Sequence, residues 1–333
     1  MLAELASLPS GDLAPDIYGD GGTVAVLEDE VRGQLGKPAA VFMPSGTMAQ
    51  QIALRIHADR RNRRVVAFHP TCHLELHEDR AYQRLHGLVG RTVGDARELI
   101  TLADLQEITE PLAALVLELP QREIGGRLPA WNDLVAQVAW ARAGGAAAHL
   151  DGARLWESAA GYGRPPAEIA GLFDTVYVSF YKGLGGISGS MLLGEQDVIA
   201  EARAWRHRHG GTLLGLWPYA ASALAGLRLR LPRMDAYLAH ARAIASELAT
   251  TDGIDVLPDP PATPMMHLYL RTTAATATAG IRRLATRERI WTWGGTWPAE
   301  LPGIRVVELM VGDATLQLSP GEVAAAVREL LPA

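Results

Sequence analysis

Short apolar runs that alternate with amphipathic stretches constrain the fold of this chain more than any other feature. Helical spacing of apolar residues occurs at 47–61, 128–145 and 195–211. Strands that alternate with helices predict an α/β fold, in which helices cover both faces of a mostly parallel central sheet. The runs that indicate buried strands are 39–46, 64–70, 112–120, 146–152, 174–182 and 189–194.

A second α/β pattern begins near residue 231. An amphipathic helix at 231–250 precedes strand-like runs at 264–272 and 303–312, and helical patterns occupy 277–290 and 319–331. A chain of 333 residues has room for one large domain and one smaller domain. We therefore predict a large domain at 1–230 and a small C-terminal α/β domain at 231–333.

Composition argues against several functional classes. The net charge of −6 gives no sign of the basic face that nucleic-acid binding usually needs. Cys72 is the single cysteine, which excludes an intrachain disulfide. The first residues do not resemble a signal peptide, and no apolar run approaches the roughly 18 residues of a membrane helix. We expect a cytoplasmic protein with neither a nucleic acid nor a membrane as its partner.

Three polar motifs follow predicted strands, at 44–47, 149–154 and 179–183. Ligands of such sheets bind at the carboxyl ends of the strands, so we expect these motifs to meet in one site. In the first motif, free backbone N–H groups at a helix start favour a phosphate group. A plain helix N-cap explains the same residues, which are Ser45, Gly46 and Thr47.

Asp151 and Lys182 each have two interpretations. A carboxylate at a strand end caps a loop or binds a cation, and beside pyridoxal phosphate it keeps the pyridine nitrogen protonated. A lysine in a desolvated site forms a Schiff base with an aldehyde, whereas a lysine at a strand edge has no chemical role. Neither residue decides between these interpretations by itself.

Four histidines, His69, His73, His77 and His86, lie close together in the sequence. The proximity of Glu78 raises the question of zinc, but the His-Glu-x-x-His arrangement and a second cysteine are both missing. We therefore expect no metal. An imidazole stacked on an aromatic cofactor accounts for one of these histidines, and we expect the others on the polar surface.

Together these motifs resemble the threonine aldolase and β-eliminating lyase family of fold-type I pyridoxal phosphate enzymes. The matching strings are YGDGGTVAVLEDEV at 18–31, PSGTMA at 44–49, HLDGAR at 149–154 and SFYKGLGG at 179–186. They occur in the family's order and cover most of residues 18–230, whereas the C-terminal third matches weakly. The resemblance implies pyridoxal 5'-phosphate as cofactor, an amino acid as substrate, and a homo-oligomer, either a dimer or a tetramer.

The resemblance also implies roles for single residues. Lys182 carries the cofactor as an aldimine, Asp151 pairs with its pyridine nitrogen, and His73 stacks on its ring. Arg154 approaches the phenolic oxygen or the substrate carboxylate. Arg305 binds the substrate carboxylate through two parallel hydrogen bonds, although a surface arginine at a strand edge would look the same.

The remaining roles concern the phosphate and the subunit boundary. By the resemblance, the phosphate is held by Ser45, Gly46 and Thr47. Tyr18 and Gly19 match a segment that lies near the cofactor of a neighbouring subunit in this family. The implied reaction breaks the Cα–Cβ bond of a β-hydroxy-α-amino acid and yields glycine and an aldehyde. His73 is the best candidate for the base that takes the β-hydroxyl proton.

The chain departs from the family pattern at positions that face the substrate. The N-terminal Arg-Ser-Asp-Thr stretch is missing, and Gln121 stands where family members have a histidine near the β-hydroxyl. Leu213 replaces an arginine and Gly22 replaces a proline. The change at Gln121 keeps β-elimination or racemisation on the same scaffold open as an alternative. A non-catalytic cofactor-binding or assembly protein is a third hypothesis, against which the presence of Lys182, Asp151 and His73 argues.

Three tryptophans, Trp291, Trp293 and Trp297, lie shortly before Arg305. If their loop borders the site, they would line a pocket for a bulky aldehyde side chain. Packing within the small domain is the other interpretation.

Overall fold

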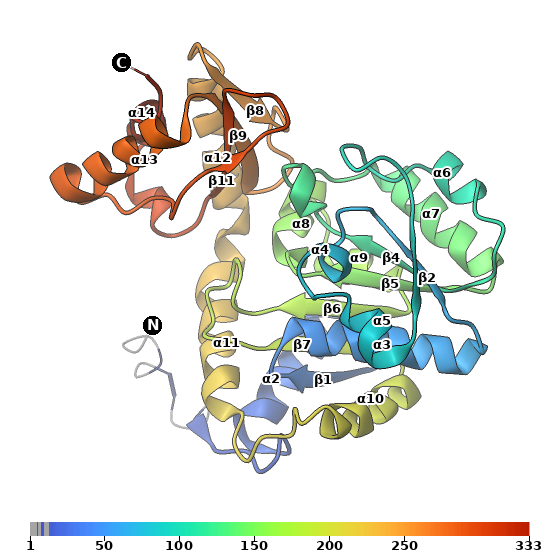
Figure 1. Ribbon diagram of the computed structural model, residues 1–333. Coiled ribbons are helices and arrows are strands. Elements are labelled where there is room, and N and C mark those ends of the chain that lie inside the picture. The colour runs from blue at the N-terminus through green and yellow to red at the C-terminus, as the bar shows by residue number, and fades with distance from the viewer. Residues whose placement is uncertain (1–4, 6–7, 10–12, 333) are drawn as a thin grey trace. The chain divides into compact units, whose positions relative to one another are not determined.

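The computed structural model describes residues 5, 8–9 and 13–332, and the chain divides into two compact units. The first unit comprises Met1–Gln121 and Leu128–Pro232, and the second comprises Arg122–Arg127 and Arg233–Ala333. Figure 1 shows the helices and strands of both. The large domain that we predicted at 1–230 included the short segment Arg122–Arg127.

A seven-stranded sheet forms the centre of the first unit, in the order β1-β7-β6-β5-β4-β2-β3. All six predicted strand runs form strands. β3 was not predicted, because its four residues are exposed and carry no apolar run. The bounds are β1 Ala39–Met43, β2 Val65–Phe68, β3 Val89–Thr92, β4 Leu112–Glu118, β5 Ala147–Gly152, β6 Thr175–Ser179 and β7 Ser190–Gly194.

Only β7 runs against its neighbours, since it pairs antiparallel with both β1 and β6. The connection from β6 to β7 spans only residues 180–189, and a parallel pair needs a crossover of a dozen or more residues. The short connection therefore reverses the chain. All residues of β5, β6 and β7 are buried, as expected for strands covered on both faces.

The helices of the first unit connect and cover these strands. The longest is α3, which begins after its N-cap Ser45 and ends where Asn62 adopts a left-handed conformation. α3 and α10 enclose one core cluster with β1, β6 and β7. The bounds are α2 Gly22–Leu35, α3 Gly46–Arg61, α4 His73–Leu76, α5 Ala81–His86, α6 Leu102–Gln106, α7 Trp131–Ala143, α8 Leu155–Tyr162, α9 Pro166–Gly171, α10 Gln196–Arg208 and α11 Trp217–Arg230.

The second unit contains a four-stranded antiparallel sheet in the order β10-β11-β9-β8. Arg122 joins the segment Arg122–Arg127 to this unit through an ion pair with Glu308, whose Oε2 lies 2.8 Å from Arg122 Nε. The bounds are α12 Met234–Leu248, β8 Ile254–Leu257, β9 Met265–Arg271, α13 Ala274–Arg283, β10 Trp297–Pro298, β11 Ile304–Met310 and α14 Pro320–Arg328. Of the helices in the described ranges, none is long and apolar enough to cross a membrane.

Candidate active site

The strand directions bring the three polar motifs to one edge of the sheet. β1, β5 and β6 all run the same way, because β7 alone is reversed between β1 and β6. Their carboxyl ends therefore place Ser45, Asp151 and Lys182 at the same edge. His73 lies at the start of α4, where the charges of Asp151 and Lys182 act on its pKa.

Asp151 is a buried carboxylate that accepts two hydrogen bonds. Its side chain is on β5, and the residue is only 1% exposed. Gln50 Nε2 donates to Oδ2 at 2.6 Å, and Ala153 N donates to Oδ1 at 3.1 Å. Donors of this kind offset the cost of burying a carboxylate away from water. The residue is therefore able to bind a protonated ring nitrogen.

A buried glutamate orients His73. His73 Nδ1 lies 2.9 Å from Glu78 Oε1, and the other Glu78 oxygen accepts from Gln51 Nε2 at 2.7 Å. Burial lowers the pKa of His73, but the hydrogen bond to Glu78 and the carboxylates of Asp151 and Glu78 outweigh it, so that the pKa is raised. When Nδ1 carries the hydrogen donated to Glu78, Nε2 is the basic atom of the ring.

Lys182 lies in the turn that follows β6. Two of the residues after it are glycines because larger side chains would clash with their neighbours. A Cβ on Gly183 would lie 2.1 Å from Glu157 Oε1, and one on Gly186 would lie 2.8 Å from Phe180 O. Gly186 N also donates to Phe180 O at 2.7 Å, which closes the turn. Larger residues at 183 or 186 would push the lysine loop outward.

Glu157 is a site residue that the sequence analysis missed. It lies on α8, is 1% exposed, and belongs to the same turn of chain as Arg154, which is 8% exposed. Burial raises the pKa of Glu157, although the charges of Arg154 and Lys182 act in the opposite direction. Its place in the string HLDGARLWE, six residues after Asp151, was the available signal.

The sequence left two interpretations of the start of α3 open, a helix N-cap and a phosphate site, and its geometry suits both. Ser45 is an N-cap, because its side chain accepts from Met48 N at 3.3 Å. Gly46 lies against Tyr177, where a Cβ would come within 2.1 Å of the phenol oxygen. Two serines hold this turn from the other side: Ser188 Oγ of the lysine loop donates to Pro44 O at 3.0 Å, and Ser190 Oγ of β7 donates to Ser45 O at 2.9 Å. Backbone N–H groups at such a helix start suit an anion.

The prediction that the other histidines lie on the surface was wrong for two of them. His69 is 2% exposed, and its ring bonds to Thr71 Oγ1 and Glu98 O. His86 is 6% exposed and packs edge-on against Trp205. His77 is exposed, with its ring 5.2 Å from that of His73. Within residues 5, 8–9 and 13–332, no three metal-ligating side chains form a group.

Gln121 lies at the end of β4 and is 4% exposed. Its Nε2 is 3.2 Å from Glu118 Oε2 and 3.3 Å from Thr71 Oγ1. Glu118 is the direct neighbour of Asp151 across the sheet, so Gln121 belongs to the same edge. An amide that already donates to two neighbours is a poor proton acceptor, unlike the family's histidine.

Arg305 and the three tryptophans belong to the second unit. Arg305 Nε donates to Thr296 Oγ1 at 2.9 Å, and its Nη2 donates to Thr296 O. Trp291 and Trp293 line a cavity of about 500 Å³ in this unit. Trp297 packs edge-on against His267.

Two glutamines near the start of α3 were also missed. Gln50 and Gln51 are each 1% exposed and hold the carboxylates of Asp151 and Glu78. The available signal was their position: two adjacent amides stand in the first turns of a helix, with apolar residues on either side of them in the sequence. Buried amides of this kind usually have a hydrogen-bond partner nearby.

Comparison with known proteins places this geometry in a family. A sequence profile described as "Beta-eliminating lyase" matches residues 1–273. A solved structure from Exiguobacterium sp. 255-15, named as a candidate aromatic amino acid β-eliminating lyase/threonine aldolase, is 39% identical. It has a TM-score of 0.92 and covers 99% of this chain and 92% of that chain.

Two further relatives agree with this match. A candidate L-allo-threonine aldolase structure from Listeria monocytogenes EGD-E is 38% identical, with a TM-score of 0.93, over 99% of this chain and 91% of that chain. Low-specificity L-threonine aldolase 1 of Arabidopsis thaliana is 29% identical over 261 residues, which is 74% of this chain and 72% of that protein. These likenesses confirm the predicted fold class and the family resemblance.

Proposed function

The chain belongs to the β-eliminating lyase family, and on this premise we propose that it is a pyridoxal 5'-phosphate-dependent aldolase. It would cleave the Cα–Cβ bond of β-hydroxy-α-amino acids such as threonine, allo-threonine or phenylserine, giving glycine and an aldehyde. The observation that carries this proposal is the meeting of Asp151, Lys182 and a glutamate-oriented His73 at one sheet edge. The relatives named for threonine aldolase activity support it.

The residues at this edge fit the cofactor. Lys182 would bond to its aldehyde carbon, Asp151 to its pyridine nitrogen, and Arg154 to its phenolic oxygen. The fit rests on the donor set: a carboxylate with two donors of its own, a lysine in a tight glycine turn, and an open helix start. When bound, pyridoxal phosphate supplies an electron sink for the bond that breaks at Cα. The phosphate would be held by Ser45, Gly46 and Thr47.

His73 would act as the general base. Glu78 holds the Nδ1 side of the ring, so Nε2 would take the proton of the β-hydroxyl group as the Cα–Cβ bond breaks. The raised pKa makes the imidazole a stronger base than a free histidine. The aldehyde then leaves with its new carbonyl, and the proton stays on His73 until it returns to the glycine carbon or to water.

Four residues would contact the substrate. Arg154 and Arg305 are the candidates for the substrate carboxylate, since guanidinium groups pair with carboxylates through two hydrogen bonds. Gln121 would lie near the β-carbon, because it shares the sheet edge with Asp151. Tyr18 would come from a neighbouring subunit.

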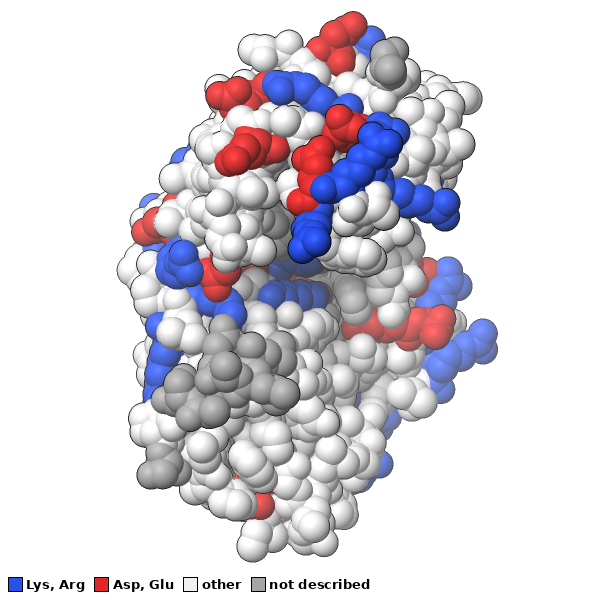
Figure 2. Space-filling model, turned by 90° about the vertical axis from the view of Figure 1, so that its left-hand side faces the viewer, with Lys and Arg blue, Asp and Glu red and all other residues white. Residues whose placement is uncertain are grey.

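We further propose a homo-oligomer, a dimer or a tetramer, that forms through an exposed apolar surface of the first unit. Ile17 and Tyr18 are 67% and 53% exposed, and Leu213 and Leu214 are 43% and 68% exposed. Asp16 joins the two segments, because its carboxylate accepts from Gly19 N, Leu216 N and Trp217 N. Figure 2 shows a broad area with few charged side chains in the lower part of the view. Exposed apolar patches of this kind mark association sites.

One observation favours a second function. Gln121 stands in place of the family's histidine, and its amide is already bound to Glu118 and Thr71. Without a histidine near the β-hydroxyl group, removal of the hydroxyl proton would be less efficient, which favours β-elimination or racemisation of an amino acid.

A cytoplasmic location stays a prediction from composition.

The test is a product assay on the purified protein loaded with pyridoxal phosphate. L-threonine, L-allo-threonine and L-serine are each added, and aldehyde, keto acid with ammonia, and the opposite enantiomer are measured. Aldehyde and glycine from the β-hydroxy substrates support the aldolase. Keto acid or enantiomer without aldehyde supports the second function. Lys182→Ala is the control and should lose both the cofactor's visible absorbance and all products.

A further inference from the structure

A chain of five hydrogen bonds runs through the interior of the first unit and ends on Asp151. It crosses from α3 to β5 and β6 and returns to α3. The linked atoms are Arg61 Nη1 and His57 Nδ1 at 3.3 Å, His57 Nε2 and Thr175 Oγ1 at 2.7 Å, Thr175 Oγ1 and His149 Nδ1 at 2.8 Å, His149 Nε2 and Gln50 Oε1 at 3.2 Å, and Gln50 Nε2 and Asp151 Oδ2 at 2.6 Å.

The interior members of this chain are fully enclosed. His149 and Thr175 are 0% exposed, Gln50 is 1% exposed and His57 is 2% exposed. Burying four polar side chains in a row is unfavourable unless each is paired. Apolar side chains would fill the same space at lower cost, so the pairing itself calls for an explanation.

The donors in the chain all point the same way. Arg61 has only donors, so His57 Nδ1 must accept and the ring hydrogen must be on Nε2. The Thr175 oxygen accepts that hydrogen and gives its own to His149 Nδ1. His149 in turn donates from Nε2 to the Gln50 oxygen, which leaves the Gln50 amide hydrogens for Asp151.

The protonation of the two rings agrees with this order. Burial, with the charges of Arg61 and Arg60, lowers the pKa of His57 to about 3. Burial and the neighbouring His57 lower the pKa of His149 to about 3, against the opposing effect of Asp151. Each ring is therefore neutral near pH 7 and carries a single hydrogen, as the one-way order of donors requires.

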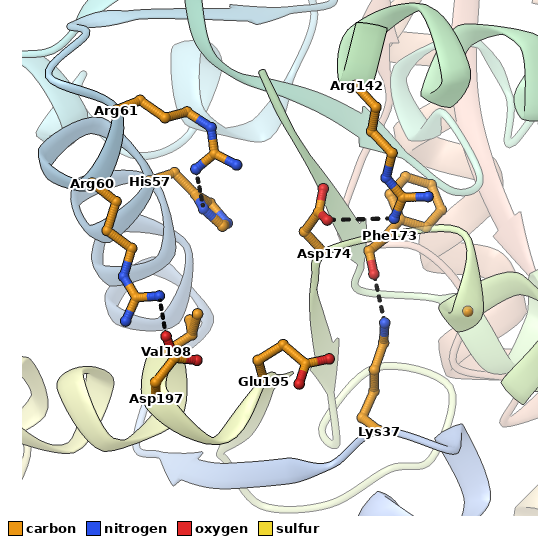
Figure 3. A pocket seen from close by; sticks show the side chains of 11 residues that line it. Lys37, His57, Arg60, Arg61, Arg142, Phe173, Asp174, Glu195, Asp197 and Val198 are labelled. Atoms are coloured by element: carbon orange, nitrogen blue, oxygen red, sulfur yellow. Dashed lines mark hydrogen bonds and ion pairs between the residues drawn. The ribbon is translucent and has the colours of Figure 1, made fainter. Parts of the chain in front are cut away.

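The far end of the chain reaches a polar pocket at the amino ends of the strands. Figure 3 shows Arg61 directed at His57 inside this pocket, with Arg142 and Lys37 on the opposite wall. The cavity measures about 590 Å³, and Arg61 Nε is fixed there by Gly145 O at 3.0 Å. The cation that sets the direction of the chain is thus anchored on the side of the sheet opposite the active-site edge.

We propose that this chain of hydrogen bonds positions Asp151 for the cofactor. Through Arg61, His57, Thr175 and His149, it keeps the Gln50 amide donating to the Asp151 carboxylate. The carboxylate is thereby held in place to bind the cofactor's pyridine nitrogen. This proposal rests on the proposed function, because it concerns the same Asp151. The residues between Arg61 and Asp151 touch no substrate; they act only through the carboxylate.

Thr175 is the link on which the order depends. Without its hydroxyl, His149 Nδ1 is a buried acceptor with no donor, and the ring is held only by its Nε2 bond to Gln50 Oε1. A ring held at one atom is free to turn away. The Gln50 amide then loses the partner that fixes it toward the Asp151 carboxylate.

Thr175→Val tests this prediction, because valine keeps the shape and removes the hydroxyl. The probe is pyridoxal 5'-phosphate labelled with ¹⁵N in its ring. In the variant we expect the ¹⁵N resonance to move toward the position of an unprotonated pyridine and the cofactor Kd to rise roughly tenfold, as for the loss of one charge-assisted hydrogen bond. We expect kcat to fall by a similar factor while KM changes less than about twofold.

The controls separate the hydroxyl from packing. Thr175→Ser should restore the wild-type resonance. Thr272→Val should leave resonance and Kd unchanged, since it removes a hydroxyl that is also buried but donates to Leu330 O in the second unit. If Thr175→Val fails to fold, Arg61→Met with Arg61→Lys as its rescue tests the same chain from its partly exposed end.

The outcomes are distinct. The proposal is overturned if Thr175→Val keeps the wild-type resonance and Kd, or if Thr175→Ser moves them as far as valine does. If wild-type protein binds no labelled cofactor, the proposed function itself fails. A cofactor that binds to all variants with the same resonance leaves the proposed function intact and rejects the positioning chain.

Discussion

At the scale of single residues, the site works through partners that hold its functional groups. His73 has a raised pKa because Glu78 and Asp151 offset its burial, and Glu78 is itself fixed by Gln51. Asp151 accepts hydrogen bonds from Gln50 Nε2 and Ala153 N, which fix the orientation of its carboxylate. In both cases a glutamine side chain of α3 donates a hydrogen bond to the carboxylate and so fixes its orientation. Supporting contacts of this kind set the orientation and basicity of the group that reacts.

The pair formed by His73 and Glu78 predicts a shift in the pH profile. In Glu78→Gln the carboxylate that raises the His73 pKa is gone, so that pKa falls. In the proposed reaction the neutral imidazole is the base, and it is present above its pKa, so the acid limb of the kcat/KM profile should move to lower pH. The rate on the plateau should drop about tenfold or more, because the ring is a weaker and less well-held base.

The measurement is aldehyde release from a β-hydroxy amino acid across the pH range. Glu75→Gln is the matched control, because Glu75 lies on α4 with His73 but bonds to Tyr82 and Arg80. An acid limb that stays in place in Glu78→Gln would show that His73 is not the titrating base.

At the scale of elements, the lysine turn is the most constrained segment. It reverses the chain between β6 and β7 over residues 180–189. Ser188 of this turn donates to Pro44 O, just before the N-cap of α3, and Gly183 packs on α8. Four elements therefore meet around Lys182. A change in this turn should act on cofactor binding and on stability together.

Gly183→Ala tests that constraint. The added Cβ would lie 2.1 Å from Glu157 Oε1, and Glu157 is fully enclosed, so a neighbour must move. We expect a loss of about 1–3 kcal/mol in the free energy of unfolding and weaker cofactor binding. Urea denaturation and a cofactor titration measure the two effects.

Gly171→Ala provides the comparison, since a Cβ there meets no atom within 4 Å. Its free energy of unfolding should stay within about 0.5 kcal/mol of the wild-type value. Equal behaviour of the two variants would mean that the space beside Glu157 is not limiting.

At the scale of the whole molecule, the apolar surface around Leu214 predicts self-association. Leu214→Arg places a charge in the middle of this surface, where burial against a second copy would desolvate it. We expect the variant to shift from an oligomer to a monomer and to lose activity, because Tyr18 would no longer reach a neighbouring site. Light scattering coupled to size-exclusion chromatography gives the mass.

Leu85→Arg is the matched control, because Leu85 is 64% exposed on α5, outside that surface. It should keep the wild-type mass. A wild-type protein that is already monomeric, or a Leu214→Arg variant with unchanged mass, contradicts the proposed interface.

The sequence alone determined the α/β class, six of the seven strands of the large sheet, and the edge at which Ser45, Asp151 and Lys182 meet. These follow from local rules: apolar periodicity sets the elements, and parallel strands put their carboxyl ends together. The exposed β3 was missed because it has no apolar pattern. The sequence analysis missed that Arg122–Arg127 belongs to the second unit, because contacts such as the ion pair between Arg122 and Glu308 join residues far apart in the chain.

Only the tertiary structure decided which polar residues support the site. Gln50, Gln51 and Glu157 are ordinary helix residues in the sequence, and their roles come from carboxylates or cations contributed by distant segments. His57 and His149 are 92 residues apart (149 − 57), yet both bond to the Thr175 hydroxyl. A hydrogen bond depends on positions in space to within a few tenths of an ångström, whereas a sequence pattern fixes only which face of an element a residue occupies.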